Sequence, residues 1–226
     1  TTLLNALLSS IPDDKRIYTI ESGARELFLV KRNRFGEVQN NVVHTLSRPS
    51  ENQAYNITQE NLVVAALRFD PDIVVVGEVR DAEANSAVEA SLTGHTVVTT
   101  VHSGPAEAAH GRISLLCQRR FQLGMEVSLA QSRQAFPVVV FAHKCEDNSR
   151  KVMDVSECYV SPEGKTEYRC LYRYNITENL CENGKYMIHG YFEKINTPSE
   201  HLKTQLTRSG VPQEVLNQFA RKGAIT

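Results

Sequence analysis

The chain has 226 residues, a length that suits one large or two small domains and leaves ample material for a core. Its 25 basic and 26 acidic residues give a formal net charge of −1, which excludes a global attraction to nucleic acid or to an anionic membrane. The longest apolar runs fall far short of a membrane span, and we recognise no signal peptide. The five cysteines are odd in number and lack CxxC spacing, which favours reduced cytosolic thiols over a zinc site or a disulfide framework.

The first half of the chain alternates predicted helices and strands. Leucines within residues 3–8 predict a short helix that no strand precedes. Residues 16–21 (RIYTIE) predict a strand that ends in an acid, and residues 40–46 predict another. Apolar spacing favours a helix over residues 59–68, which leads into the central strand.

The central stretch carries the strongest functional signal. Ile73–Val76 is an unbroken β-branched run, typical of a strand that is buried on both faces, and Glu78 follows it almost at once. A second buried strand is expected over Thr96–Val101 and leads directly to His102. Two neighbouring parallel strands would present Glu78 and His102 at the same edge of the sheet, where ligands bind in open α/β sheets. This layout favours a site that handles phosphate.

Helices and one more strand complete the predicted core. Asp81 is a plausible N-cap of a helix between the two central strands, and Gly94 can close that helix. Two further helices are expected over residues 106–117 and 124–136. Residues 137–142 are predicted as the last strand of the core.

The C-terminal part of the chain, residues 147–226, differs in predicted structure from the first part, and we recognise no catalytic or ligand-binding motif in it. It predicts three antiparallel strands, over residues 152–160, 167–174 and 186–192. A capping box headed by Thr197 predicts a helix with Pro198 at its first position, ending near Gly210. A second short helix is expected after Pro212 and before Gly223.

Three ordered motifs resemble those of the type II/type IV secretion ATPases, most closely the CpaF-like branch. VVVGEVRD at residues 74–81 and TGHTVVTTVHS at 93–103 resemble the Walker B and His boxes of this family. YTIESGAREL at 18–27 resembles its acidic box, and the opening TTLLNALL is similar to the residues directly after the GSGK of its phosphate loop. The resemblance is firm over residues 1–140 and loose beyond them.

The resemblance implies an α/β fold with a RecA-like P-loop NTPase core and a mostly parallel sheet, over residues 1–146. Residues 147–226 would form a C-terminal antiparallel β-meander with short helices. The implied activity is ATP hydrolysis with ATP and Mg²⁺. Thr1 matches the loop hydroxyl that ligates Mg²⁺, with Thr2 beside it as a nucleotide-binding candidate. Because the loop glycines and lysine are absent, we expect a fragment that begins inside the phosphate loop and has negligible turnover by itself.

The resemblance also suggests catalytic carboxylates. Glu21 would help to arrange Mg²⁺, water and the γ-phosphate, with Glu26 in reserve, although Ser22 stands where the family has Asp. Glu78 would orient or deprotonate the attacking water. A typical Walker B box has Asp where Gly77 stands, a substitution that the secretion ATPases share. The alternative for Glu21 is a solvated strand-end carboxylate paired with an arginine.

The remaining candidates keep two interpretations each. His102 could contact the γ-phosphate or water, or it could be a hydrogen-bonded histidine at a strand end. Because side chains alternate along a strand, His102 and His95 should point to opposite faces of the sheet, and we therefore expect no metal ion shared between them. Arg80 could sense nucleotide across a subunit joint or pair with a nearby carboxylate. Arg112 is a weaker candidate for reaching a neighbouring subunit, and Arg68 is as plausibly a surface ion pair. The basic cluster at residues 31–34 favours a solvated loop over a phosphate or partner contact.

By resemblance, the parent protein is a cytoplasmic homohexameric motor at the inner face of a membrane. It would bind ATP at subunit joints and push on an inner-membrane platform protein, driving pilus assembly, protein secretion or DNA uptake. Two alternatives remain open: a catalytically silent ring or scaffold, and a nucleic-acid motor on the same core. Near-neutral charge and the lack of a basic stripe argue against direct binding of nucleic acid.

Overall fold

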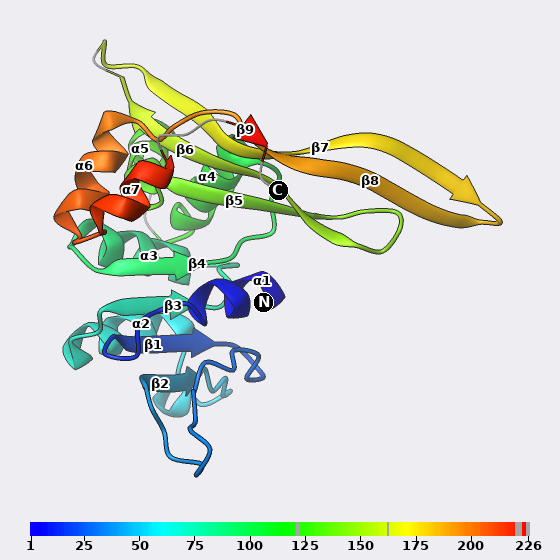
Figure 1. Ribbon diagram of the computed structural model, residues 1–226. Coiled ribbons are helices and arrows are strands. Elements are labelled where there is room, and N and C mark those ends of the chain that lie inside the picture. The colour runs from blue at the N-terminus through cyan, green and yellow to red at the C-terminus, as the bar shows by residue number, and fades with distance from the viewer. Residues whose placement is uncertain (121–122, 162, 220–222, 225–226) are drawn as a thin grey trace. The chain divides into compact units, whose positions relative to one another are not determined.

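The computed structural model describes residues 1–120, 123–161, 163–219 and 223–224, and it divides into two compact units. The first unit comprises residues 1–102 with 110–136, and the second comprises residues 103–109 with 137–226. Figure 1 labels the helices and strands of both units along the chain. Across the described ranges, no helix is both long enough and apolar enough to cross a membrane.

The first unit is built on a parallel sheet of four strands in the order β2-β1-β3-β4. These strands are β1 (Arg16–Glu21), β2 (Asn41–Leu46), β3 (Ile73–Val76) and β4 (Thr96–Thr99). β3 lies between β1 and β4, with Val76 in register with Ile20 on one side and Thr99 on the other. The parallel core that the sequence predicted is therefore confirmed, although β4 is shorter than expected.

Five α-helices and two 3₁₀ turns accompany this sheet in the described part of the chain. They are α1 (Thr2–Leu8), η1 (Gln53–Tyr55), α2 (Gln59–Ala66), η2 (Leu67–Phe69), α3 (Glu83–Leu92), α4 (Ala106–Cys117) and α5 (Met125–Ala135). α2 begins with a reciprocal capping box in which Asn61 takes the place of the usual Glu, bonding back to Thr58. α3 begins after Ala82, so the expectation that Asp81 caps it is wrong; Asp81 instead forms an ion pair with Arg119 at 3.1 Å.

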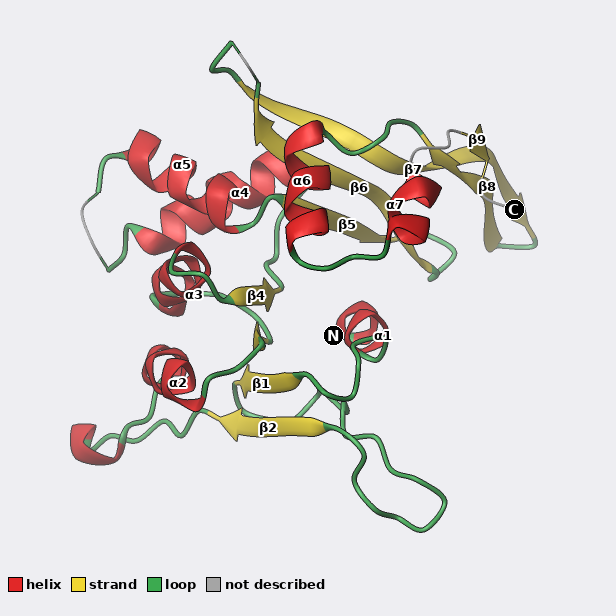
Figure 2. Cartoon of the chain, turned by 60° about the vertical axis from the view of Figure 1, so that its left-hand side comes forward, coloured by secondary structure: helices red, strands yellow, loops and turns green. Residues whose placement is uncertain are grey.

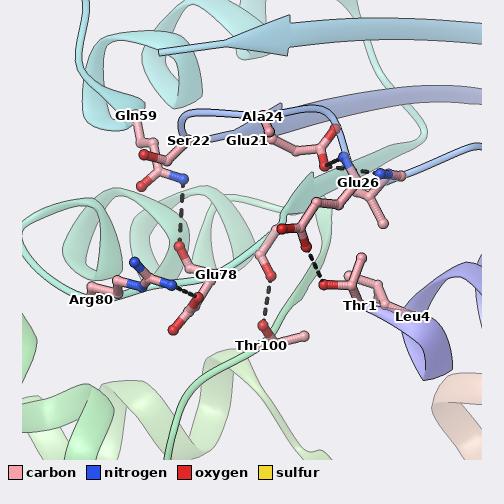
Figure 3. A pocket seen from close by; sticks show the side chains of 12 residues that line it. Thr1, Leu4, Glu21, Ser22, Ala24, Glu26, Gln59, Glu78, Arg80 and Thr100 are labelled. Atoms are coloured by element: carbon pink, nitrogen blue, oxygen red, sulfur yellow. Dashed lines mark hydrogen bonds and ion pairs between the residues drawn. The ribbon is translucent and has the colours of Figure 1, made fainter. Parts of the chain in front are cut away.

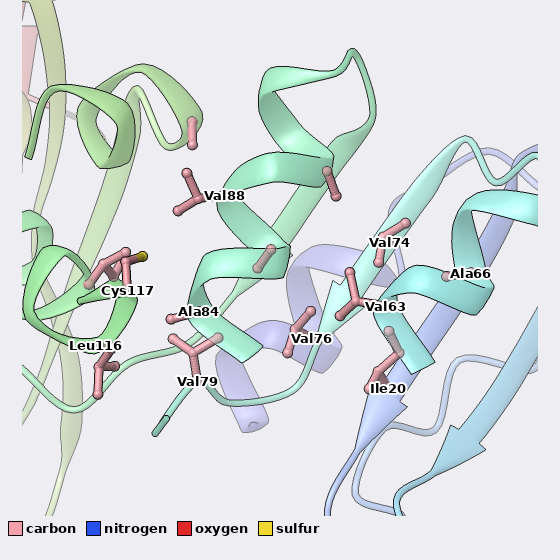
Figure 4. Close-up of a cluster of buried hydrophobic side chains, with 14 of the residues drawn as sticks. Ile20, Val63, Ala66, Val74, Val76, Val79, Ala84, Val88, Leu116 and Cys117 are labelled. Carbon is pink, nitrogen blue, oxygen red and sulfur yellow. The ribbon is translucent and has the colours of Figure 1, made fainter. Parts of the chain in front are cut away.

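Alternate residues of β3 enter two separate hydrophobic clusters. Val74 and Val76 pack with side chains of α2, α3 and α4, as Figure 4 shows. Val75 points to the other face and joins a cluster that includes Leu4 and Leu8 of α1. All three valines are fully buried, and each contributes about 1.5–3 kcal/mol through the apolar surface it removes from water. Burial on both faces explains the unbroken apolar run and fixes where β3 ends.

The second unit contains an antiparallel sheet in the order β5-β6-β7-β8-β9 (Figure 2). Its strands are β5 (Val138–Lys144), β6 (Arg150–Val160), β7 (Thr166–Glu182), β8 (Lys185–Lys194) and β9 (Gly223–Ala224). Asn183 and Gly184 connect β7 to β8 with φ of 50° and 75°, the left-handed pair that a tight hairpin requires. The predicted meander is confirmed.

Two sequence predictions are wrong in this unit. Residues 137–142 do not form the last strand of the parallel core, because β5 pairs antiparallel with β6 and alternates between half-buried and exposed positions. α6 (Glu200–Arg208) is capped by Ser199 rather than Thr197: the Ser199 hydroxyl accepts the N–H of Leu202 at 3.1 Å. α7 (Gln213–Phe219) follows Pro212 as expected.

Candidate active site

The carboxyl ends of β1, β3 and β4 meet at one edge of the parallel sheet. Glu21 is the last residue of β1, Glu78 follows β3 by two positions, and His102 lies three residues beyond β4. A cavity of about 100 Å³ opens at this edge (Figure 3). It is lined by Thr1, Leu4, Glu21, Ser22, Ala24, Glu26, Leu27, Gln59, Gly77, Glu78, Arg80 and Thr100.

Glu21 presents an unpartnered carboxylate oxygen in the wall of this cavity. The residue is only 4% exposed. Its Oε1 accepts the backbone N–H groups of Glu26 at 2.7 Å and of Leu27 at 2.9 Å. Its Oε2 is buried and has no hydrogen-bond partner among the described residues. Because a buried polar atom without a partner is costly, this oxygen marks a place where a ligand contact can form.

Gly77 leaves room beside Glu21. A Cβ atom built on Gly77 would lie 3.4 Å from Cγ of Glu21 and 3.5 Å from the carbonyl oxygen of Ile20. A carboxylate at position 77, as in a typical Walker B box, would therefore stand against the Glu21 carboxylate and repel it. Glycine at this position leaves space for the Glu21 carboxylate, which comes from the neighbouring strand β1.

Glu78 is held between two cationic or potentially cationic side chains. Its Oε2 accepts a hydrogen bond from the Arg80 guanidinium (Figure 3), and its Oε1 lies 3.2 Å from Nε2 of His102. The latter contact lacks hydrogen-bond geometry. The Arg80 hydrogen bond holds the pKa of Glu78 below its usual value, outweighing partial burial, which acts in the opposite direction. The carboxylate is therefore ionised at neutral pH.

Thr1 and the other predicted residues differ in how near they lie to this cavity. The Thr1 hydroxyl donates to Oε2 of Glu26 at 2.6 Å, so the reserve acid of the acidic box contacts the predicted magnesium ligand. Thr2 is exposed and is not among the lining residues. Arg112 and Arg68 are exposed in α4 and η2, also outside the lining. Their proposed nucleotide contacts stay predictions.

The other candidates have local partners. Lys31 donates to the carbonyl oxygen of Ile11 at 3.0 Å and forms an ion pair with Asp13 at 2.6 Å. Arg32 donates to the carbonyl oxygen of Gly36 within the same loop. Nδ1 of His95 lies 3.3 Å from the carbonyl oxygen of Ala90, at the end of α3. These contacts support the solvated-loop interpretation of residues 31–34 and keep His95 away from the strand-end site.

The sequence did not single out Gln59 or Thr100. The Gln59 side chain donates to the backbone carbonyl of Glu78 at 3.5 Å, and the Thr100 hydroxyl donates to the carbonyl of Gly77 at 2.6 Å. Both contacts support the segment after β3. Thr100 lies near the end of the strand predicted over Thr96–Val101 and directly after the observed β4, so its position could have suggested a role at the strand end. Gln59 starts a helix 19 residues before Glu78 and gave no signal.

The parallel sheet with its flanking helices defines an α/β core, and a solved structure shares it. The crystal structure of the VirB11 ATPase from the Brucella suis type IV secretion system, in complex with sulphate, matches with a TM-score of 0.57 and 27% identity. The match covers 69% of this chain and 45% of that one. The fold is RecA-like.

Sequence comparison reaches the same family. Residues 1–214 match the family described as Type II/IV secretion system protein. The type IV secretion system protein PtlH of Bordetella pertussis is 32% identical over 162 residues, covering 69% of this chain and 45% of PtlH. Competence protein ComGA of Streptococcus pneumoniae is 43% identical over 63 residues, covering 27% of this chain and 20% of ComGA. The chain belongs to the type II/IV secretion ATPase family, and it spans less than half the length of these relatives.

Proposed function

We propose that this chain is the ATPase domain of a CpaF-like secretion or pilus-assembly motor, which hydrolyses ATP to drive pilus assembly, protein secretion or DNA uptake. The observation that supports this most is the meeting of Glu21, Glu78 and His102 at the ends of three adjacent parallel strands. The motor would work as a cytoplasmic homohexamer on an inner-membrane platform protein. Residues 147–226 would form a second domain that joins subunits or holds the partner.

The donor set fits Mg²⁺. The Thr1 hydroxyl would ligate the ion, and the unpartnered Oε2 of Glu21 supplies a buried acceptor for the ion or its water. Among the described residues no cluster of three metal-binding side chains occurs, and Mg²⁺ commonly takes only one or two protein ligands, completing its octahedron with phosphates and water. The ion would neutralise charge on the β- and γ-phosphate oxygens during transfer.

The chain's own residues would act on the attacking water. The ionised Glu78 carboxylate would accept a hydrogen bond from the water and later its proton, on the side of the sheet where β3 ends. His102 would contact the γ-phosphate or the same water from β4. Arg80 holds Oε2 of Glu78, whereas Oε1 has no hydrogen-bond partner among the described residues, so Oε1 is the oxygen that would accept the water.

The cavity at the strand ends accommodates only part of a nucleotide. Its volume of about 100 Å³ suits a terminal phosphate with water, whereas ligand pockets commonly measure about 300–1,000 Å³. The remainder of ATP would be held by a complete phosphate loop and by a neighbouring subunit. Arg80 and Arg112 are our candidates for contacts across that joint.

Equilibrium binding of ATP tests the site directly. In a protein where a complete phosphate loop precedes Thr1, we expect affinity to fall by at least about tenfold when Mg²⁺ is chelated, because a metal ion contributes several kcal/mol to holding phosphate charge. Fluorescence titration with a labelled ATP analogue, with and without EDTA, measures this. Equal affinities would contradict the assignment of a magnesium site to Thr1 and Glu21.

Replacing Arg80 with Ala should move the acid limb of the pH–turnover profile to higher pH. Arg80 lowers the pKa of Glu78, so its removal returns that pKa toward the usual value, and the reactive ionised form is then lost at a higher pH as the solution is acidified. The measurement is phosphate release between pH 4 and pH 8. Arg34, an exposed arginine stacked on Phe35, gives a matched Ala control whose profile should not move. An unshifted limb in the Arg80 variant would show that Glu78 does not control it.

A further inference from the structure

The segment that carries Glu78 is held by hydrogen bonds on two sides, one toward β4 and one toward α3. Residues 77–82 connect β3 to α3 without regular structure. On the β4 side, the Thr100 hydroxyl donates to the carbonyl of Gly77 at 2.6 Å, and the N–H of Val79 donates to the carbonyl of Thr100 at 2.9 Å. These two bonds fasten the residues on either side of Glu78 to the neighbouring strand.

On the α3 side, the buried carboxylate of Glu83 binds the backbone of Arg80 and Asp81. Glu83, the first residue of α3, is 7% exposed. Its Oε1 accepts the backbone N–H of Arg80 at 2.5 Å and the backbone N–H of Asp81 at 2.9 Å. The positive charge of the Arg80 guanidinium also interacts with this carboxylate, which lies at the positive end of α3.

The position of Glu83 connects it to the catalytic carboxylate. It does not line the cavity. It binds the backbone of Arg80, whose guanidinium in turn donates to Glu78. Loss of the Glu83 carboxylate would free the backbone N–H groups of Arg80 and Asp81. The segment would then be held by its bonds to Thr100, Gln59 and Arg119, none of which binds these two N–H groups. The backbone positions from which the Glu78 and Arg80 side chains extend would no longer be fixed from the α3 side.

We propose that Glu83 is a positioning residue for ATP hydrolysis: its carboxylate fixes residues 78–81 so that Glu78 and Arg80 keep their mutual geometry. This inference rests on the proposed ATPase function. A displacement of a catalytic group by about 1 Å can cost roughly 100-fold in rate, because the reaction requires the reacting atoms to be aligned. Binding of ATP depends on other residues and should be preserved.

A helix cap with no catalytic consequence is the competing explanation, and substitutions separate the two. Glu83→Ala removes both acceptor bonds. Glu83→Gln keeps a carbonyl oxygen at Oε1 that can accept the same two N–H groups, so it should restore most of the lost rate. Glu89→Ala serves as the matched control, because Glu89 lies on the same helix and is exposed.

The test combines kinetics with amide hydrogen exchange in a protein that carries a complete phosphate loop. We expect Glu83→Ala to lower kcat about 10- to 100-fold with little change in KM, to speed amide exchange at Arg80 and Asp81, and to keep the wild-type circular dichroism spectrum. Glu83→Gln should recover kcat and slow the exchange again. The Glu89→Ala control should match wild type in every readout.

Other outcomes overturn the inference. Unchanged exchange at Arg80 and Asp81 in Glu83→Ala would show that the carboxylate does not fix the segment. Faster exchange with unchanged kcat would reduce Glu83 to a helix cap. If the wild-type protein itself shows no turnover, the proposed function fails, whereas the exchange data still decide whether Glu83 fixes the segment.

Discussion

Replacing Glu78 with Gln is expected to lower ATP turnover by about 10²- to 10⁴-fold in a protein where a complete phosphate loop precedes Thr1. Glutamine has the same shape but cannot accept a proton, so the attacking water loses its base while the strand ends keep their geometry. ATP binding should persist, because the role proposed for Glu78 is to act on water rather than on the nucleotide. Phosphate release at saturating ATP measures the first effect, and a binding titration measures the second.

Glu89→Gln is the control for this experiment. Glu89 is an exposed carboxylate on α3, so the change removes the same charge from the same part of the chain without touching the cavity. Its turnover should equal that of the parent protein. If Glu78→Gln also turned over ATP at the parental rate, Glu78 would be a structural partner of Arg80 and the catalytic base would have to be another group, with Glu21 next in line.

The second large effect is expected in the β7–β8 hairpin, where Gly190→Ala should destabilise the antiparallel sheet. A Cβ atom at position 190 would lie 2.3 Å from the backbone carbonyl oxygen of Asn175 and 2.8 Å from ring atoms of Tyr174. Tyr174 is buried and packs edge-on against Phe192, with ring centroids 5.0 Å apart. Moving either the Tyr174 ring or the β7 backbone to make room for the new methyl group would therefore disturb this packing. We expect a loss of about 1–3 kcal/mol in the free energy of unfolding, typical of overpacking.

Urea unfolding followed by circular dichroism measures this loss, and Gly111→Ala provides the matched control. Gly111 lies inside α4, and a Cβ atom there meets nothing within 4 Å. Alanine is the better helix former by about 1 kcal/mol, so the control should unfold at a higher urea concentration. If the two glycine-to-alanine changes alter the free energy of unfolding in opposite directions, the space around each glycine, rather than the substitution itself, determines the effect on stability. A stable Gly190→Ala chain would contradict the close packing of β8 on Tyr174.

The edge that carries the site could be predicted because its signals are local. A fully apolar run such as Ile73–Val76 is hard to accommodate except between two covered faces, and an acid directly after it must then stand at the end of the strand. The same holds for His102 after β4. Glu21 could also be placed, since RIYTIE ends in its only acid. Three strand ends were thus available from the sequence before their order in the sheet was known.

Other features escaped prediction because they depend on distant partners. The apolar run at residues 137–142 fits a buried parallel strand and a half-buried antiparallel one equally well, and only its pairing with β6 decides. Thr197 and Ser199 are both good caps; Ser199 is used, and its backbone N–H and hydroxyl donate to the buried carboxylate of Glu157.

Phosphate release per chain, followed across protein concentration with Glu78→Gln in parallel, tests the central claim most directly. The protein should carry a complete phosphate loop before Thr1. We predict that turnover per chain rises with concentration toward a plateau, because in our proposal a neighbouring subunit completes the site. The Glu78→Gln variant should lose this turnover. No turnover at any concentration, despite ATP binding, would contradict the claim and leave a RecA-like ring component that does not hydrolyse ATP.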